Sequence, residues 1–95
     1  MLKINTKQVL KNFKQEALKN GKDDLTVGMV VSSILGGKVS NPYKGWILGK
    51  RFATEKEVEL KAEDVVFLKK EIEASEAWLA VVTGQLIEML DGGKE

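Results

Sequence analysis

The chain has 95 residues, which is the size of one small domain. Hydrophobic residues make up 43% of it and charged residues 31%, with one proline and nine glycines, so the composition excludes a disordered or low-complexity chain. Cysteine and histidine are both absent, which excludes disulfides, zinc–thiolate sites, thiol nucleophiles and histidine-based acid–base catalysis. We therefore expect no enzyme activity, no cofactor and no metal site.

Charge is spread unevenly along the sequence, although fifteen basic and fourteen acidic residues leave a net charge of only +1. Residues 1–22 hold six lysines and one glutamate, whereas residues 55–95 hold five basic and eleven acidic residues. Such a chain can attract a second copy head to tail, bind a polyanion with its basic part, or neutralise itself on folding. The N-terminus lacks the apolar core of a secretory signal, and no apolar stretch approaches the ~20 residues that span a bilayer. We expect a cytoplasmic protein that does not bind membranes.

Residues 1–24 permit two interpretations. In one, Thr6 caps a helix. Its apolar face would be formed by Val9, Leu10, Phe13 and Ala17. In the other, Leu2–Ile4 or Val9–Leu10 is a strand, and Ala17–Leu18 is the returning strand of a hairpin. The spacing alone does not decide between helix and hairpin.

A turn and a short helix come next. Asn20-Gly21 predicts a turn because both residues tolerate a positive φ. Leu25–Leu35 is predicted to be a helix, since Thr26 can cap it and its apolar residues recur at helical spacing. Gly28, Ser32 and Ser33 fall on the opposite face. Gly36-Gly37 ends the helix, where glycine allows a positive φ.

Asn41-Pro42 opens a further helix, predicted to run to about Phe52 or Ala53. Asn41 can cap it, and Pro42 occupies the first helical position, where a missing N–H does no harm. Gly45 and Gly49 lie four residues apart and make a groove that a second helix can approach closely. The apolar residues fall on two sides, Tyr43, Trp46 and Ile47 on one and Leu48 and Phe52 on the other.

The last forty residues combine an extended segment with a long helical pattern. Thr54–Leu60 fits either a capping box or an extended connector, and the alternation in Glu57–Leu60 favours the connector. Beyond it, apolar residues recur at alternating steps of three and four, as in a heptad seam. The seam comprises Val65, Leu68, Ile72, Leu79, Val82, Leu86 and Met89. Because Ser75 interrupts it, the pattern predicts either one long helix or two helices hinged near Ser75.

Together these patterns predict one domain over residues 1–95 that is mainly α, with three to four helices. An α+β fold with a small N-terminal β-hairpin is the alternative. The seam either packs within the chain or carries self-association, and small chains often gain missing burial by forming oligomers. We predict a homo-oligomer that acts by protein–protein contact. The predicted interface comprises Trp78, Leu79, Val82, Leu86 and Met89, with Tyr43 and Trp46 as a second apolar site.

A nucleic-acid interface is the alternative function. Lys44, Lys50 and Arg51 lie beside Tyr43 and Trp46, and basic residues next to stacking aromatics are typical of single-stranded nucleic-acid binders. The N-terminal lysines would extend that surface. The segment 45–51 does not match a phosphate-binding loop, because it has three residues between its glycines instead of four and no hydroxyl after the lysine.

Three segments carry a resemblance to known proteins: LTVGMVVSSIL, KEVELKAEDVVFLKKEIE and VVTGQLIEML. In this combination the chain resembles a group of small proteins encoded by tailed bacteriophages and prophages, over most of its length beyond residue 25. In that group the N-terminal part is a hairpin built around a glycine, and this chain has Gln15 at that place. The group has no settled activity. The resemblance therefore implies a phage setting, with a phage or host protein as partner, and carries over no functional residue.

Overall fold

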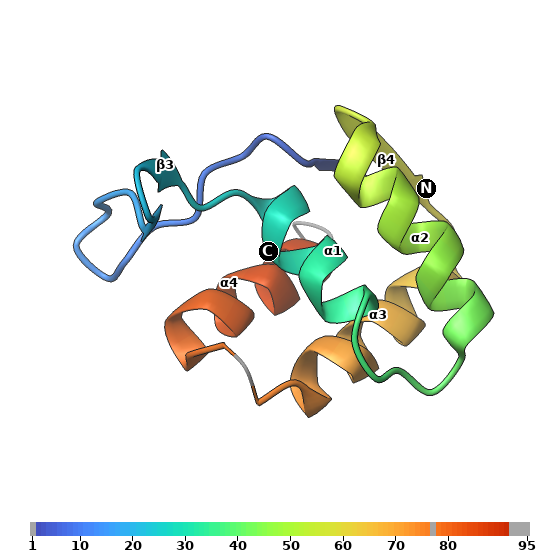
Figure 1. Ribbon diagram of the computed structural model, residues 1–95. Coiled ribbons are helices and arrows are strands. Elements are labelled where there is room, and N and C mark those ends of the chain that lie inside the picture. Colours follow the sequence, from blue (N-terminus) through green and yellow to red (C-terminus); the bar gives the residue numbers. More distant parts are fainter. Residues whose placement is uncertain (1, 77, 92–95) are drawn as a thin grey trace.

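The computed structural model describes residues 2–76 and 78–91, which form four helices and two small antiparallel sheets (Figure 1). The mainly α prediction with N-terminal β structure is thus confirmed. The helices are α1 (Val27–Leu35), α2 (Pro42–Thr54), α3 (Ala62–Ala74) and α4 (Ala80–Leu90). The strands are β1 (Leu2–Asn5), β2 (Lys19–Asn20), β3 (Asp23–Asp24) and β4 (Glu57–Leu60). All four helices, β1 and β4 contribute buried side chains to a single core cluster.

Strand β1 pairs with β4, far away in the sequence, and not with a neighbouring segment. The register is antiparallel and places Ile4 opposite Val58, both of which are buried. Thr6 extends the pairing, since its backbone N–H donates to the Lys56 carbonyl at 2.9 Å. The alternation of buried and exposed residues in β4 confirms the extended interpretation of this segment.

Residues 7–26 form a looped hairpin, so the helical interpretation of the N-terminal segment is wrong. The Leu18 N–H donates to the Leu10 carbonyl at 2.9 Å, and the Leu10 N–H donates to the Leu25 carbonyl at 2.8 Å. Leu10 is completely buried between these partners. The Asn20-Gly21 turn is confirmed, because it joins β2 to β3 and Gly21 has a φ of 71°. Figure 1 shows the hairpin projecting from one side of the helical body.

The tip of this hairpin is held by the side chain of Asn12. Its Oδ1 accepts from the backbone N–H groups of Lys14 at 2.9 Å and Glu16 at 3.0 Å. The turn also requires a left-handed residue, and Gln15 takes that conformation with a φ of 67°. This costs a side-chain-bearing residue about 1–2 kcal/mol, a cost that glycine avoids.

We therefore expect Gln15→Gly to raise the free energy of unfolding by about 0.5–1 kcal/mol, after the greater entropy of glycine in the unfolded chain is subtracted. Chemical denaturation monitored by circular dichroism measures the change. Gln8→Gly is the matched control, because Gln8 is exposed and does not have a positive φ. The control should be neutral or destabilising, and a loss of stability in Gln15→Gly would contradict the expectation.

Helices α1 and α2 begin directly after Thr26 and Asn41, the two residues predicted to cap them. The Thr26 side chain accepts from the Met29 N–H, and the Asn41 side chain accepts from the Lys44 N–H. Helix α1 ends at Leu35, directly before Gly36-Gly37 as predicted, and Gly36 has a φ of −81°, so it does not use the positive φ that glycine allows.

Glycines allow α1 and α2 to pack closely. A Cβ on Gly45 would lie 2.8 Å from Val39 Cγ2 and 3.1 Å from the Leu35 carbonyl oxygen, in agreement with the predicted groove. Gly28, however, is buried, and a Cβ there would lie 2.7 Å from the Phe52 carbonyl oxygen. At this position, the side of α1 opposite its main apolar face is therefore also packed against the rest of the chain. The close contact with the end of α2 explains why this position lacks a side chain.

The C-terminal seam is divided between two helices, α3 and α4, which a break after Ala74 separates. Of the two alternatives, the helical pair hinged near Ser75 is confirmed. Leu68 and Ile72 from α3 and Val82 and Leu86 from α4 are buried in the same core.

Candidate protein-interaction surface

The predicted interface residues of the C-terminal segment do not share one surface. Val82 and Leu86 are buried, the latter with 2% of its surface exposed, so they serve the intramolecular packing that the seam also allowed. Trp78 and Met89 are partly buried against the core. Leu79, which directly precedes α4, is 75% exposed. Of the predicted C-terminal interface, only Leu79 and the exposed parts of the Trp78 and Met89 side chains are therefore accessible to a partner.

The second predicted apolar site is more accessible. Tyr43 and Trp46 are 73% and 61% exposed, whereas Gly45, Leu48 and Phe52 on the opposite side of α2 are buried. With about 100° of rotation per residue, Tyr43, Trp46 and Lys50 fall on one outward-facing stripe. We call these three residues the α2 aromatic face.

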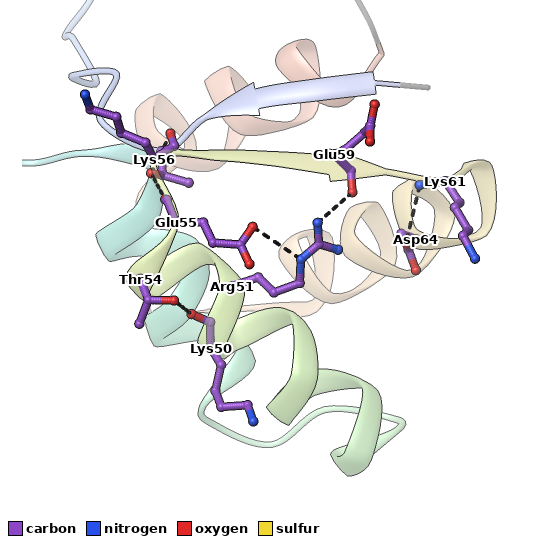
Figure 2. Close-up of polar contacts among 9 residues, drawn as sticks. Lys50, Arg51, Thr54, Glu55, Lys56, Glu59, Lys61 and Asp64 are labelled. Atoms are coloured by element: carbon purple, nitrogen blue, oxygen red, sulfur yellow. Dashed lines mark hydrogen bonds and ion pairs between the residues drawn. The ribbon is translucent and has the colours of Figure 1, made fainter.

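Two of the three basic residues on α2 have acidic partners. Lys44 Nζ lies 3.5 Å from Asp64 Oδ1 and 5.3 Å from the centre of the Phe67 ring, so it fastens α2 to the start of α3. Arg51 reaches towards β4, and Figure 2 shows its guanidinium between the Glu55 carboxylate and the Glu59 carbonyl. The distances are 3.6 Å from Nε to Glu55 Oε1 and 3.2 Å from Nη2 to the Glu59 oxygen.

Lys50 belongs to the α2 aromatic face. Its Nζ lies 5.1 Å from the centre of the Trp46 ring, within range of a cation–π contact. Below Trp46, an open hollow of about 420 Å³ follows the joint between α1 and α2. Its walls include Leu35, Val39 and Pro42. The indole therefore stands at the edge of an apolar depression that can receive a side chain from another molecule.

Sequence reasoning missed two exposed apolar residues and one buried acid. Phe13 and Val66 are largely exposed, and nothing in the local sequence distinguishes them from core residues. Glu71 is buried and accepts hydrogen bonds from Ser40. Its position directly before Ile72 of the heptad seam was the one feature of the sequence that could have indicated its burial. Within the described part of the chain, no cluster of three or more acidic side chains is suited to hold a metal ion.

None of the helices in residues 2–76 and 78–91 combines the length and hydropathy needed to cross a bilayer. Searches against protein-family models, curated proteins and solved structures find no match to this chain.

Proposed function

We propose that the protein acts by protein–protein contact and that it self-associates through the α2 aromatic face. The observation that carries this proposal is the exposure of Tyr43 and Trp46 on the side of α2 that faces away from the core. Tryptophan and tyrosine are enriched among the residues that dominate binding energies at interfaces. Exposure of both side chains on one helix leaves apolar area that residues 2–76 and 78–91 do not cover.

Charge supports a second copy as the partner. Helix α2 contains Lys44, Lys50 and Arg51 and no acidic residue. Residues 55–95 carry a surplus of six acidic groups, from eleven acidic and five basic residues. Lys50, the cation of the α2 aromatic face, is therefore complementary to the acidic half of the next copy. From the resemblance to phage and prophage proteins we propose that this contact belongs to an accessory or assembly factor, or to an inhibitor of a host protein in the host cytoplasm.

We expect sedimentation velocity to show concentration-dependent association of the wild-type protein. Trp46→Ala should weaken it by about 30-fold, which corresponds to about 2 kcal/mol at an interface hot spot. Phe13→Ala is the matched control, because Phe13 is likewise an exposed aromatic residue but lies in the N-terminal hairpin, outside both the α2 aromatic face and residues 55–95. A wild-type protein that remains monomeric at high concentration, or equal effects of both substitutions, would contradict self-association through this face.

Nucleic-acid binding is the second candidate, and one observation favours it. Lys50 lies over an exposed indole, the combination on which unpaired bases stack. The engagement of Lys44 with Asp64 and of Arg51 with Glu55 weakens this candidate, because it leaves Lys50 as the one α2 cation outside the ion pairs of the described residues. Titration of a fluorescent single-stranded oligonucleotide at two salt concentrations distinguishes the two functions, since phosphate contacts weaken steeply with salt.

A further inference from the structure

A hollow of about 200 Å³ lies between the end of α1, the loop that follows it and the end of α3. Ile34, Ala74 and Trp78 form part of its wall, and Lys38, Glu71 and Glu76 supply its charged groups. It is separate from the α2 aromatic face, since none of Tyr43, Trp46 and Lys50 lines it.

Glu71 is the unusual member of this set. Only 6% of its surface is exposed, and its two hydrogen bonds, from Ser40 N–H at 3.3 Å and Ser40 Oγ at 2.6 Å, both reach Oε2. Among the described residues, every fully enclosed side-chain nitrogen or oxygen has a hydrogen-bond partner. Oε1, which accepts neither of these bonds, is therefore not fully enclosed, and Glu71 lines the hollow.

Among the described residues, the Glu71 carboxylate has no cation within ion-pair distance. None of the ion pairs among residues 2–76 and 78–91 includes Glu71. Lys38 lines the same hollow but lies outside ion-pair distance. Burial of a charged carboxylate without a counter-charge is costly, and a cation that enters the hollow offsets that cost.

We infer that this hollow is a binding site for a primary ammonium group on a short alkyl chain. The ammonium lies against Glu71 Oε1, with Glu76 adding negative charge. The alkyl part packs on Ile34 and the Trp78 ring, which also attracts a cation. A hollow of this volume accommodates a four-carbon chain, so the ligand is either a free alkylamine or the side chain of a lysine from another protein.

Titration of the ¹⁵N-labelled full chain with n-butylammonium chloride tests the site by NMR. We expect saturable shifts of the Ser40 and Glu71 amides and of the Trp78 indole, with a dissociation constant on the order of millimolar, as befits a ligand of so few atoms. The neutral n-butanol is the control ligand and should bind at least about tenfold more weakly, because it lacks the charge-assisted hydrogen bond. A capped Gly-Lys-Gly peptide separates the sources: shifts with the peptide assign a lysine side chain, and shifts with butylammonium alone assign a free amine.

Two variants make the test decisive. Glu71→Gln should reduce butylammonium affinity by about tenfold or more, with folding checked by circular dichroism. Should that variant fail to fold, Lys38→Ala replaces it and should strengthen binding several-fold, because it removes the competing positive charge from the wall. Equal binding of butanol and butylammonium, saturable binding that survives Glu71→Gln, or an affinity that Lys38→Ala leaves unchanged would each overturn the inference.

Discussion

Leu86→Ala is expected to lower the free energy of unfolding by about 3 kcal/mol, within the range of 2–5 kcal/mol found for buried leucines. Leu86 is 2% exposed and contributes to the same cluster as the buried residues of α1, α2 and α3. Its truncation removes apolar contacts and leaves a cavity beneath α4. Urea denaturation followed by far-ultraviolet circular dichroism gives the change directly.

Leu79→Ala is the matched control for this substitution. Leu79 has the same side chain and the same heptad spacing, but it is 75% exposed just before α4. Its truncation should change stability by no more than about 0.5 kcal/mol. If the two substitutions cost the same in a monomeric sample, the division of the C-terminal seam between core and surface is wrong.

Gly28→Ala is expected to destabilise the protein by about 1–3 kcal/mol, although alanine favours helices by about 1 kcal/mol over glycine. The new Cβ would lie 2.7 Å from the Phe52 carbonyl oxygen and 3.1 Å from that of Thr6. Both neighbours are backbone atoms, so neither can move aside by a change of rotamer. Helix α1 would have to shift away from α2 and from the segment after β1. Thermal and urea unfolding measure the cost.

Gly84→Ala is the control for Gly28→Ala, because it measures the effect of helix propensity on stability without a steric clash. Gly84 lies inside α4, and a Cβ there would meet no atom within 4 Å. The substitution should therefore stabilise the protein by up to about 1 kcal/mol. Opposite signs at positions 28 and 84 are the expected result, and a stabilising effect at both would contradict the close packing of α1 on α2.

Local chemistry was sufficient to predict much of the helical part. Thr26 and Asn41 have side chains that can accept from N–H groups at the start of a helix, and both do so. The alternation in β4 likewise fixed an extended conformation. In each case, the conformation is determined by residues that are close together in the sequence, so it can be predicted from the local sequence alone.

Long-range pairing decided what the sequence left open. Val9, Leu10, Phe13 and Ala17 fit a helical face as well as a hairpin, because their spacing says nothing about partners elsewhere. The backbone of Leu10 bonds to Leu18 and Leu25, and β1 pairs with β4. Those distant contacts, rather than local preference, exclude the helix.

The candidate site was predictable as a set of residue types but not as a surface. A heptad pattern shows which residues share one side of a helix, but it does not show where the helix breaks. Leu79 therefore fits the heptad spacing although it is exposed. On α2, both sides are apolar. The burial of Gly45, Leu48 and Phe52 against the rest of the chain leaves Tyr43 and Trp46 on the outer side of α2.

The pairing of β1 with β4 has a consequence for how the protein forms on the ribosome. Thr6 and Glu55, which are hydrogen-bonded at the end of this sheet, are 49 residues apart in sequence. At a synthesis rate of about 5–20 residues per second, the first strand waits several seconds before its partner exists. During that interval α1 is completed, whereas α2 ends at Thr54, directly before Glu55, so the sheet can close only after both helices have been synthesised.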